Sequence, residues 1–243
     1  MVEFTGKHKE SYLKTLEHFG VNGNDCTFES LKERALHLQA DLPEKGVARW
    51  HDTIVQNLIR PGQSVIDLGC GDGELLYMLS QKNNCWIQGI ETDEVKVNHC
   101  IERGVPVCHG DLSEVMRLLP DNSYDWAVLE NTIQTLRSPM QVLDEMLRIS
   151  KHSIVSFPNF AHWSVRFTFS LGGRMPVTKS LPYKWYNTPN IHLCSITDFL
   201  DWVDETKIHI LNAWVLVEGN VVPFTRDSDQ NIMGEQALFV IEK

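Results

Sequence analysis

From about residue 60 onward, the chain alternates short apolar runs with stretches of helical periodicity. A run of four to six β-prone residues predicts a buried strand, and apolar positions three and four residues apart predict an amphipathic helix. The alternation favours an open α/β sheet with helices between its strands. The runs that predict strands are 65–68, 86–90, 105–109, 124–129 and 153–157.

Two further strands are predicted near the C-terminus, at 207–218 and 234–242. A polar loop joins them, so they predict an antiparallel hairpin at the end of the sheet. Helices are predicted at 94–103, where Gly104 stops the helix, and after Ser138 and Ser195, which are both good N-cap residues.

Residues 1–59 precede this pattern and predict an N-terminal helical extension. Within it, 28–39 and 47–59 each carry apolar side chains at helical spacing. We favour a helical cover on the sheet for this extension, and an arm for a dimer or partner is the alternative. The remaining residues, 60–243, form the predicted main domain.

A glycine-rich turn follows the first predicted strand, in the sequence Val65-Ile-Asp-Leu-Gly-Cys-Gly-Asp-Gly-Glu74. Gly69, Gly71 and Gly73 let the backbone turn tightly and approach a ligand without intervening side chains. Asp72 is expected to cap the helix that follows, whose apolar positions recur at helical spacing. A strand, a glycine turn and a helix N-terminus together predict a nucleotide-binding corner.

Asp67, within the end of that strand, indicates which nucleotide binds. A dinucleotide site would use a Gly-x-Gly-x-x-Gly turn to hold a pyrophosphate, which an acidic residue would repel. Here the glycines alternate, and a carboxylate can hold an ammonium group. The segment resembles motif I of class I S-adenosylmethionine (SAM)-dependent methyltransferases. That resemblance implies a Rossmann-like α/β fold with a seven-stranded, mostly parallel sheet that the C-terminal antiparallel hairpin closes.

Acidic residues follow the next predicted strands. Glu91 ends the second strand and is placed to accept hydrogen bonds from ribose hydroxyls, with an ordinary exposed glutamate as the alternative. In methyltransferases of this class, an acidic residue at the position of Asp111 meets the adenine amino group. Glu130 lies just past the fourth strand. The predicted set for SAM or S-adenosylhomocysteine (SAH) is Asp67, Gly69, Cys70, Gly71, Gly73, Glu91, Asp111, Leu112 and Glu130.

Composition excludes several other classes of protein. The formal charge is −10 and the pI about 5.4, which argues against a general nucleic-acid binder. Six scattered cysteines with no Cys-x-x-Cys pair argue against a zinc site, an iron–sulfur site or a disulfide framework, so no metal is expected. We expect neither a signal peptide nor a membrane span, and we expect a cytoplasmic protein.

The segment 160–194 differs from the rest of the chain. It holds seven aromatic residues and no Asp or Glu, although the whole chain is acidic. It follows the fifth strand, so it is expected to overhang the ligand pocket as a lid or to form a docking face for an anionic ligand or partner. A packed aromatic loop with solvated charges is the alternative. Its basic residues are Arg166, Arg174, Lys179 and Lys184.

Three stretches resemble one particular family within this class of methyltransferases. The motif 65–76, the segment 154–163 and the segment 172–194 resemble the methionine biosynthesis protein MetW family, over roughly residues 60–243. A departure lies at Glu130-Asn-Thr-Ile-Gln134, where the family suggests Ser-Gln-Thr-Leu-Gln. The resemblance implies a methyltransferase-like protein of the methionine pathway that acts alongside homoserine O-acyltransferase.

Two functions follow from this resemblance. The first is a SAM-binding accessory or regulatory subunit of homoserine O-acyltransferase. The second is an active methyltransferase on an unidentified small molecule or protein. Its candidate general bases are Glu130, His162 and His192, with Tyr183 and Tyr186 as positioning groups. These residues form no diagnostic constellation, so no catalytic residue is assigned.

Overall fold

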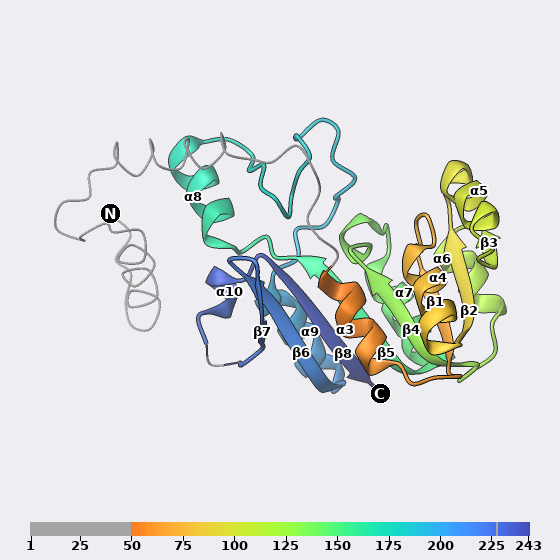
Figure 1. Ribbon diagram of the computed structural model, residues 1–243. Helices are drawn as coiled ribbons and strands as arrows, with labels where there is room; N and C mark the ends of the chain where they lie inside the picture. The colour runs from red at the N-terminus through yellow and green to blue at the C-terminus, as the bar shows by residue number, and fades with distance from the viewer. Residues whose placement is uncertain (1–49, 227) are drawn as a thin grey trace.

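A computed structural model describes residues 50–226 and 228–243 (Figure 1). These residues form one twisted sheet with the strand order β3-β2-β1-β4-β5-β8-β6-β7, covered by helices. The strands are β1 Ser64–Leu68, β2 Trp86–Glu91, β3 Val107–His109, β4 Tyr124–Glu130, β5 Ser150–Pro158, β6 His209–Val217, β7 Asn220–Pro223 and β8 Gln236–Glu242. The helices are α3 Trp50–Leu58, α4 Glu74–Asn83, α5 Glu94–Glu102, α6 Leu112–Val115, α7 Pro139–Ile149, α8 Trp163–Gly172, α9 Ile196–Thr206 and α10 Gln230–Met233, with 3-10 turns η1 Met116–Leu118 and η2 Ile133–Thr135.

The first five strands pair in parallel, and the last three are antiparallel. This confirms the predicted Rossmann-like α/β fold and the antiparallel end of the sheet. The sheet has eight strands, however, and the prediction of seven is wrong. Within the loop between the two predicted C-terminal strands, Glu218 and Gly219 both have positive φ and form a two-residue hairpin turn. Strand β7 pairs back onto β6 through this turn.

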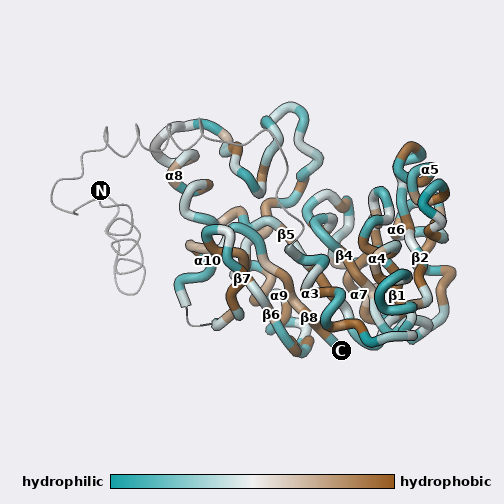
Figure 2. The backbone as a smooth tube through the Cα atoms, viewed as in Figure 1, coloured by the Kyte–Doolittle hydropathy of each residue, from teal (hydrophilic) through white to brown (hydrophobic). Residues whose placement is uncertain are grey.

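Helices cover both faces of the sheet, because neighbouring residues of a buried strand point to opposite sides. Ile66 of β1 packs with α7 and α9, whereas Val65 packs with α3 and α4. Both side chains are fully buried. Figure 2 shows apolar positions gathering along the strands and on the helices beside them. The sheet therefore has two packed cores, one on each face.

Helix α3 is the described helix within the predicted extension 1–59. It packs on the same face as α4, and Trp50 Nε1 donates a hydrogen bond of 2.9 Å to Gln236 Oε1 on β8. Helix α3 therefore packs against the sheet, and the helical cover predicted for residues 1–59 as a whole stays a prediction. The predicted helix at 28–39 lies outside the described residues, and the boundary between extension and domain stays a prediction. None of the described helices is long and apolar enough to cross a bilayer.

Helix caps match the prediction in part. Ser195 and Asp198 form a reciprocal capping box at the start of α9, and Gly104 follows α5 with a φ of +76°. The prediction for Asp72 is wrong, because Gly73 is the N-cap residue of α4. The first bond of that helix runs from Tyr77 N–H to the Gly73 carbonyl, so Asp72 lies one position too early to cap. Its carboxylate instead contacts His99 Nδ1 at 3.1 Å.

Candidate functional site

The glycine turn folds over the end of β2. The amides of Gly69 and Cys70 both donate to the Ile90 carbonyl, at 2.9 and 3.1 Å. Gly69, Gly71 and Gly73 have φ values of +84°, +56° and +72°, a region that L side chains rarely adopt. A Cβ added to Gly69 would lie 3.0 Å from Thr132, whereas no described atom lies within 4 Å of one added to Gly71. Gly71 therefore borders open space.

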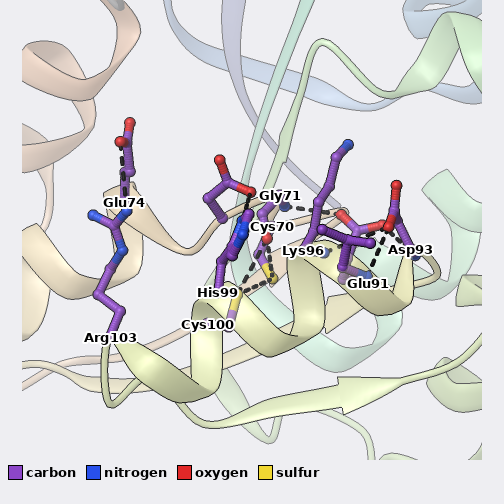
Figure 3. A network of polar contacts seen from close by, with 11 residues as sticks. Cys70, Gly71, Glu74, Glu91, Asp93, Lys96, His99, Cys100 and Arg103 are labelled. Atoms are coloured by element: carbon purple, nitrogen blue, oxygen red, sulfur yellow. Dashed lines mark hydrogen bonds and ion pairs between the residues drawn. The ribbon is translucent and has the colours of Figure 1, made fainter.

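The Glu91 side chain connects the glycine turn to the loop that follows β2 (Figure 3). Its Oε2 accepts a 2.9 Å hydrogen bond from Gly71 N–H, and its Oε1 accepts from the amides of Thr92 and Asp93 at 2.8 and 3.0 Å. The side chain is 7% exposed. Each carboxylate oxygen accepts about two hydrogen bonds, so Oε2 keeps acceptor capacity for a hydroxyl of a ligand.

We expect Glu91→Gln to weaken SAH binding about tenfold. Glutamine has an NH₂ group in place of one carboxylate oxygen. At least one of the three backbone amides therefore loses its hydrogen bond to a charged acceptor. Isothermal titration with SAH measures the effect, and Glu102→Gln at the exposed end of α5 is the control. Unchanged SAH affinity in Glu91→Gln would remove Glu91 from the site.

Asp111 caps the short helix α6 beside this corner. Its Oδ1 accepts from the Ser113 amide at 2.8 Å and from the Ser113 hydroxyl. These hydrogen bonds, with a smaller contribution from Arg137, lower the pKa of Asp111 below its usual value. The carboxylate is exposed and ionised at neutral pH. The adenine contact predicted for it stays a prediction.

A loop beyond β4 lies against both the glycine turn and the segment 160–194. Gln134, on η2, is 4% exposed. Its side-chain Nε2 donates to the Asn131 carbonyl at 2.7 Å. Its backbone carbonyl accepts from the amides of Ile191 and His192 at 2.9 and 3.0 Å. Its Oε1 is buried without a hydrogen-bond partner among the described residues. Gln134 is not among the residues predicted for the site, although it ends the segment 130–134 that departs from the family pattern.

A cavity of about 1930 Å³ opens along this edge of the sheet. It runs from Glu91 and Asp111, past η2, to the turn around Lys179 and the start of β8. Of the predicted cofactor set, four residues line it: Gly69, Glu91, Asp111 and Leu112. The other five are absent from its described lining: Asp67, Cys70, Gly71, Gly73 and Glu130.

Those five residues lie on β1, on β4 and in the glycine turn, next to residues that line the cavity. Asp67 is 3% exposed at the end of β1, and Glu130 ends β4 next to it in the sheet order. Cys70 points towards α5, where its Sγ lies 3.8 Å from Cys100 Sγ (Figure 3). Burial raises the pKa of both thiols, so they stay protonated. The Cys70 side chain therefore supports the turn from behind.

The candidate catalytic residues are not gathered in one place. Tyr183 lines the cavity, whereas Glu130, His162, His192 and Tyr186 are absent from its described lining. His162 is the N-cap residue of α8, and its Nδ1 accepts from the Ser164 amide. Burial, with a smaller contribution from Arg166, lowers the pKa of His162 to about 4. Its observed contacts are those of a helix cap.

We expect His162→Asn to reduce the acid sensitivity of the fold. An unfolded histidine has a pKa of about 6.5, so between pH 6.5 and 4 the unfolded chain binds more protons than the folded one. The free energy of unfolding therefore falls as pH falls through this window. Asparagine also caps helices but does not titrate, and it should remove about 2 kcal/mol of that fall.

Urea unfolding at pH 7 and pH 4.5 compares this variant with the wild type and with His209→Asn at an exposed position. Parallel losses in all three proteins would contradict the assignment of His162 as a buried neutral group.

The fold is the Rossmann-like fold of class I SAM-dependent methyltransferases. A possible histamine N-methyltransferase from Thermotoga maritima aligns with a TM-score of 0.57 at 17% identity, covering 88% of this chain and 91% of that chain. The [4+2]-cyclase SpnF aligns with a TM-score of 0.58 at 17% identity, covering 88% and 93%. These likenesses concern the fold alone, and the second carries the name of a different activity.

The sequence family is a more specific assignment than the fold. The sequence model of the methionine biosynthesis protein MetW matches residues 49–241, and the chain belongs to this family. A relative from Rhodopirellula baltica, the "Bifunctional methionine biosynthesis protein MetXA/MetW", is 28% identical over 200 residues. The match covers 78% of this chain and 32% of that protein, so the chain spans about a third of its length.

Proposed function

We propose that this chain binds SAM and acts with a homoserine O-acyltransferase as its accessory or regulatory subunit in methionine biosynthesis. Family membership supports a methyltransferase-like protein of that pathway. The observation that carries the ligand assignment is the Glu91 carboxylate, which closes the glycine turn beside the cavity.

The residues at this corner fit SAM. Gly71 borders open space, Glu91 keeps acceptor capacity, and Asp111 presents an ionised carboxylate. Carboxylates suit a ligand with hydroxyl, amino and ammonium groups, and they would repel a pyrophosphate. When bound, SAM supplies an electrophilic methyl group. Isothermal titration with SAM and SAH tests the assignment, and the absence of heat with both would contradict it.

The Rhodopirellula baltica relative supports the choice of partner. Its name joins MetXA and MetW in one protein. Linking two modules makes their association intramolecular and raises their effective concentration. We infer that the present chain makes the corresponding association with a separate homoserine O-acyltransferase. Co-purification of the two untagged proteins by size exclusion tests this, and independent elution at micromolar concentration would contradict it.

Regulation adds a thermodynamic requirement. SAM is a downstream product of the pathway, and it can report supply only if it binds the free chain and the complex with different affinities. The SAH dissociation constant should therefore change when the acyltransferase is present in excess. Equal constants would refute regulation and leave the accessory role standing.

The size of the cavity favours one alternative, an active methyltransferase. Its 1930 Å³ exceeds the roughly 300–1,000 Å³ of a typical small-molecule site, which leaves room for a second molecule beside SAM. Gln134 Oε1 and Ser180 Oγ are both buried without a partner among the described residues, and both residues line the cavity. They are available to orient a polar acceptor.

SAH release with pathway metabolites or the acyltransferase as acceptor tests this alternative. Gln134→Leu should lower that release without changing the affinity for SAH. An absence of SAH release across the panel would contradict the methyltransferase alternative.

A further inference from the structure

Exposed apolar side chains gather on one stretch of the chain. Seven of the fifteen large hydrophobic residues that are exposed in the described structure fall between residues 169 and 193. That stretch is about an eighth of the described chain, so an even distribution would place about two there. Trp185 is 75% exposed and Tyr186 64%. The seven are Phe169, Met175, Tyr183, Trp185, Tyr186, Ile191 and Leu193.

Trp185 and Tyr186 are held in a defined turn. The Lys184 amide donates to Asn187 Oδ1 at 2.9 Å, and the Asn187 amide donates back to the Lys184 carbonyl at 3.1 Å. The two aromatic rings lie edge to face with their centroids 5.6 Å apart, and Lys184 Nζ lies 5.9 Å from the Tyr186 ring centre. A solvent-facing Trp-Tyr pair that is already ordered loses little conformational entropy on binding.

The same segment is tied to the ligand cavity. The amides of Ile191 and His192 donate to the Gln134 carbonyl, and Gln134 lines the cavity. On the other side of the turn, Leu181 is 4% exposed, and Tyr183 reaches the cavity wall. The segment that carries Trp185 and Tyr186 therefore contacts Gln134 and includes Tyr183, which both line the cavity.

The charge of the segment indicates the chemistry of its partner. Residues 160–194 contain no Asp or Glu but carry four Arg and Lys residues, whereas the whole chain has a net charge of −10. Buried centres of interfaces are enriched in aromatic residues, Met and Arg. A basic, aromatic surface is complementary to an apolar pocket with an acidic rim.

We propose that the turn Lys184–Asn187, with Trp185 and Tyr186 as its anchors, is the docking site for an acidic face of the homoserine O-acyltransferase. This proposal rests on the proposed function, since the fused relative supplies the identity of the partner. Docking here couples to the cavity through Gln134, so the contact and the ligand can influence each other.

Trp185→Ala in the full chain tests the proposal. Calorimetric titration of separately purified acyltransferase into this variant should give a dissociation constant raised about thirtyfold, as for an interface hot spot. Trp86→Ala is the matched control. Trp86 is 77% exposed, but it begins β2, whereas the cavity borders the other end of that strand at Ile90 and Glu91. Lys184→Glu should weaken binding and Lys184→Arg should preserve it.

The outcomes separate this proposal from the proposed function. If the wild type binds the acyltransferase and Trp185→Ala binds equally well, or loses no more affinity than Trp86→Ala, the docking site is refuted and the partnership stands. If the wild type does not bind, the partnership itself fails. A wild type that self-associates through Trp185 would show that this surface serves a second copy of the chain, which also overturns the proposal. SAH affinity should be unchanged in Trp185→Ala, which shows that the variant is folded.

Discussion

Gly71→Val is expected to weaken SAH binding by at least about a hundredfold. Gly71 has a φ of +56°, donates its amide to Glu91, and borders open space where a branched side chain would project. Valine is disfavoured in that backbone region, and its methyl groups would fill space that the ligand needs. Isothermal titration with SAH measures the loss.

Gly62→Val is the matched control for backbone strain. Gly62 has a φ of +81°, and no described atom lies within 4 Å of an added Cβ. It precedes β1, at the end of that strand opposite the glycine turn. The two variants should lose similar stability, and Gly62→Val should still bind SAH. A normal isotherm for Gly71→Val would show that the ligand binds elsewhere.

The second large effect is on stability. Asn159, 1% exposed just after β5, makes four hydrogen bonds through its side chain. Its Nδ2 donates to the carbonyls of Asn231 and Gly234, both at 2.8 Å. Its Oδ1 accepts from the amides of Ala161 and Ile196, at 3.0 and 3.3 Å. One side chain thus joins the segment 160–194 to α9 and α10.

We expect Asn159→Ala to lower the free energy of unfolding by about 3 kcal/mol. Each buried polar group that loses its partner costs about 1–3 kcal/mol, and local relaxation recovers part of the total for four groups. Urea unfolding followed by circular dichroism measures the change. Asn98→Ala at an exposed position of α5 should stay within about 0.5 kcal/mol of the wild type. A loss below about 1 kcal/mol in Asn159→Ala would contradict the account.

The parallel half of the fold could be predicted from the sequence because its central strands, β1, β4 and β5, are buried on both faces over most of their length. Such strands appear as continuous apolar runs, and each of the five is found within a few residues of its predicted bounds. The third begins two residues late, since the Val105 amide still bonds to the Cys100 carbonyl and Pro106 has no N–H to donate. The sequence does not reveal strand β7, because this strand is short and exposed on most of its residues.

The site could be predicted only where local sequence determines geometry. The position of Glu91 follows from the strand that precedes it, but its three amide partners depend on how two loops meet. Asn159 and Asn231 are 72 residues apart, so no local pattern reveals their contact. Asp72 is an example of a local pattern that misleads. Aspartate is a good capping residue, but helix α4 begins one residue later and Gly73 is its N-cap residue. The ligand contacts assigned to the predicted set stay predictions.

The most direct test of the central claim is the initial rate of the cognate homoserine O-acyltransferase, measured alone and with this chain while SAM is titrated. The account predicts that the rate depends on the concentration of the chain and that SAM shifts this dependence at constant substrate. Gly71→Val should retain the effect of the chain and lose the response to SAM. A rate that is the same at every concentration of chain and SAM would contradict the claim.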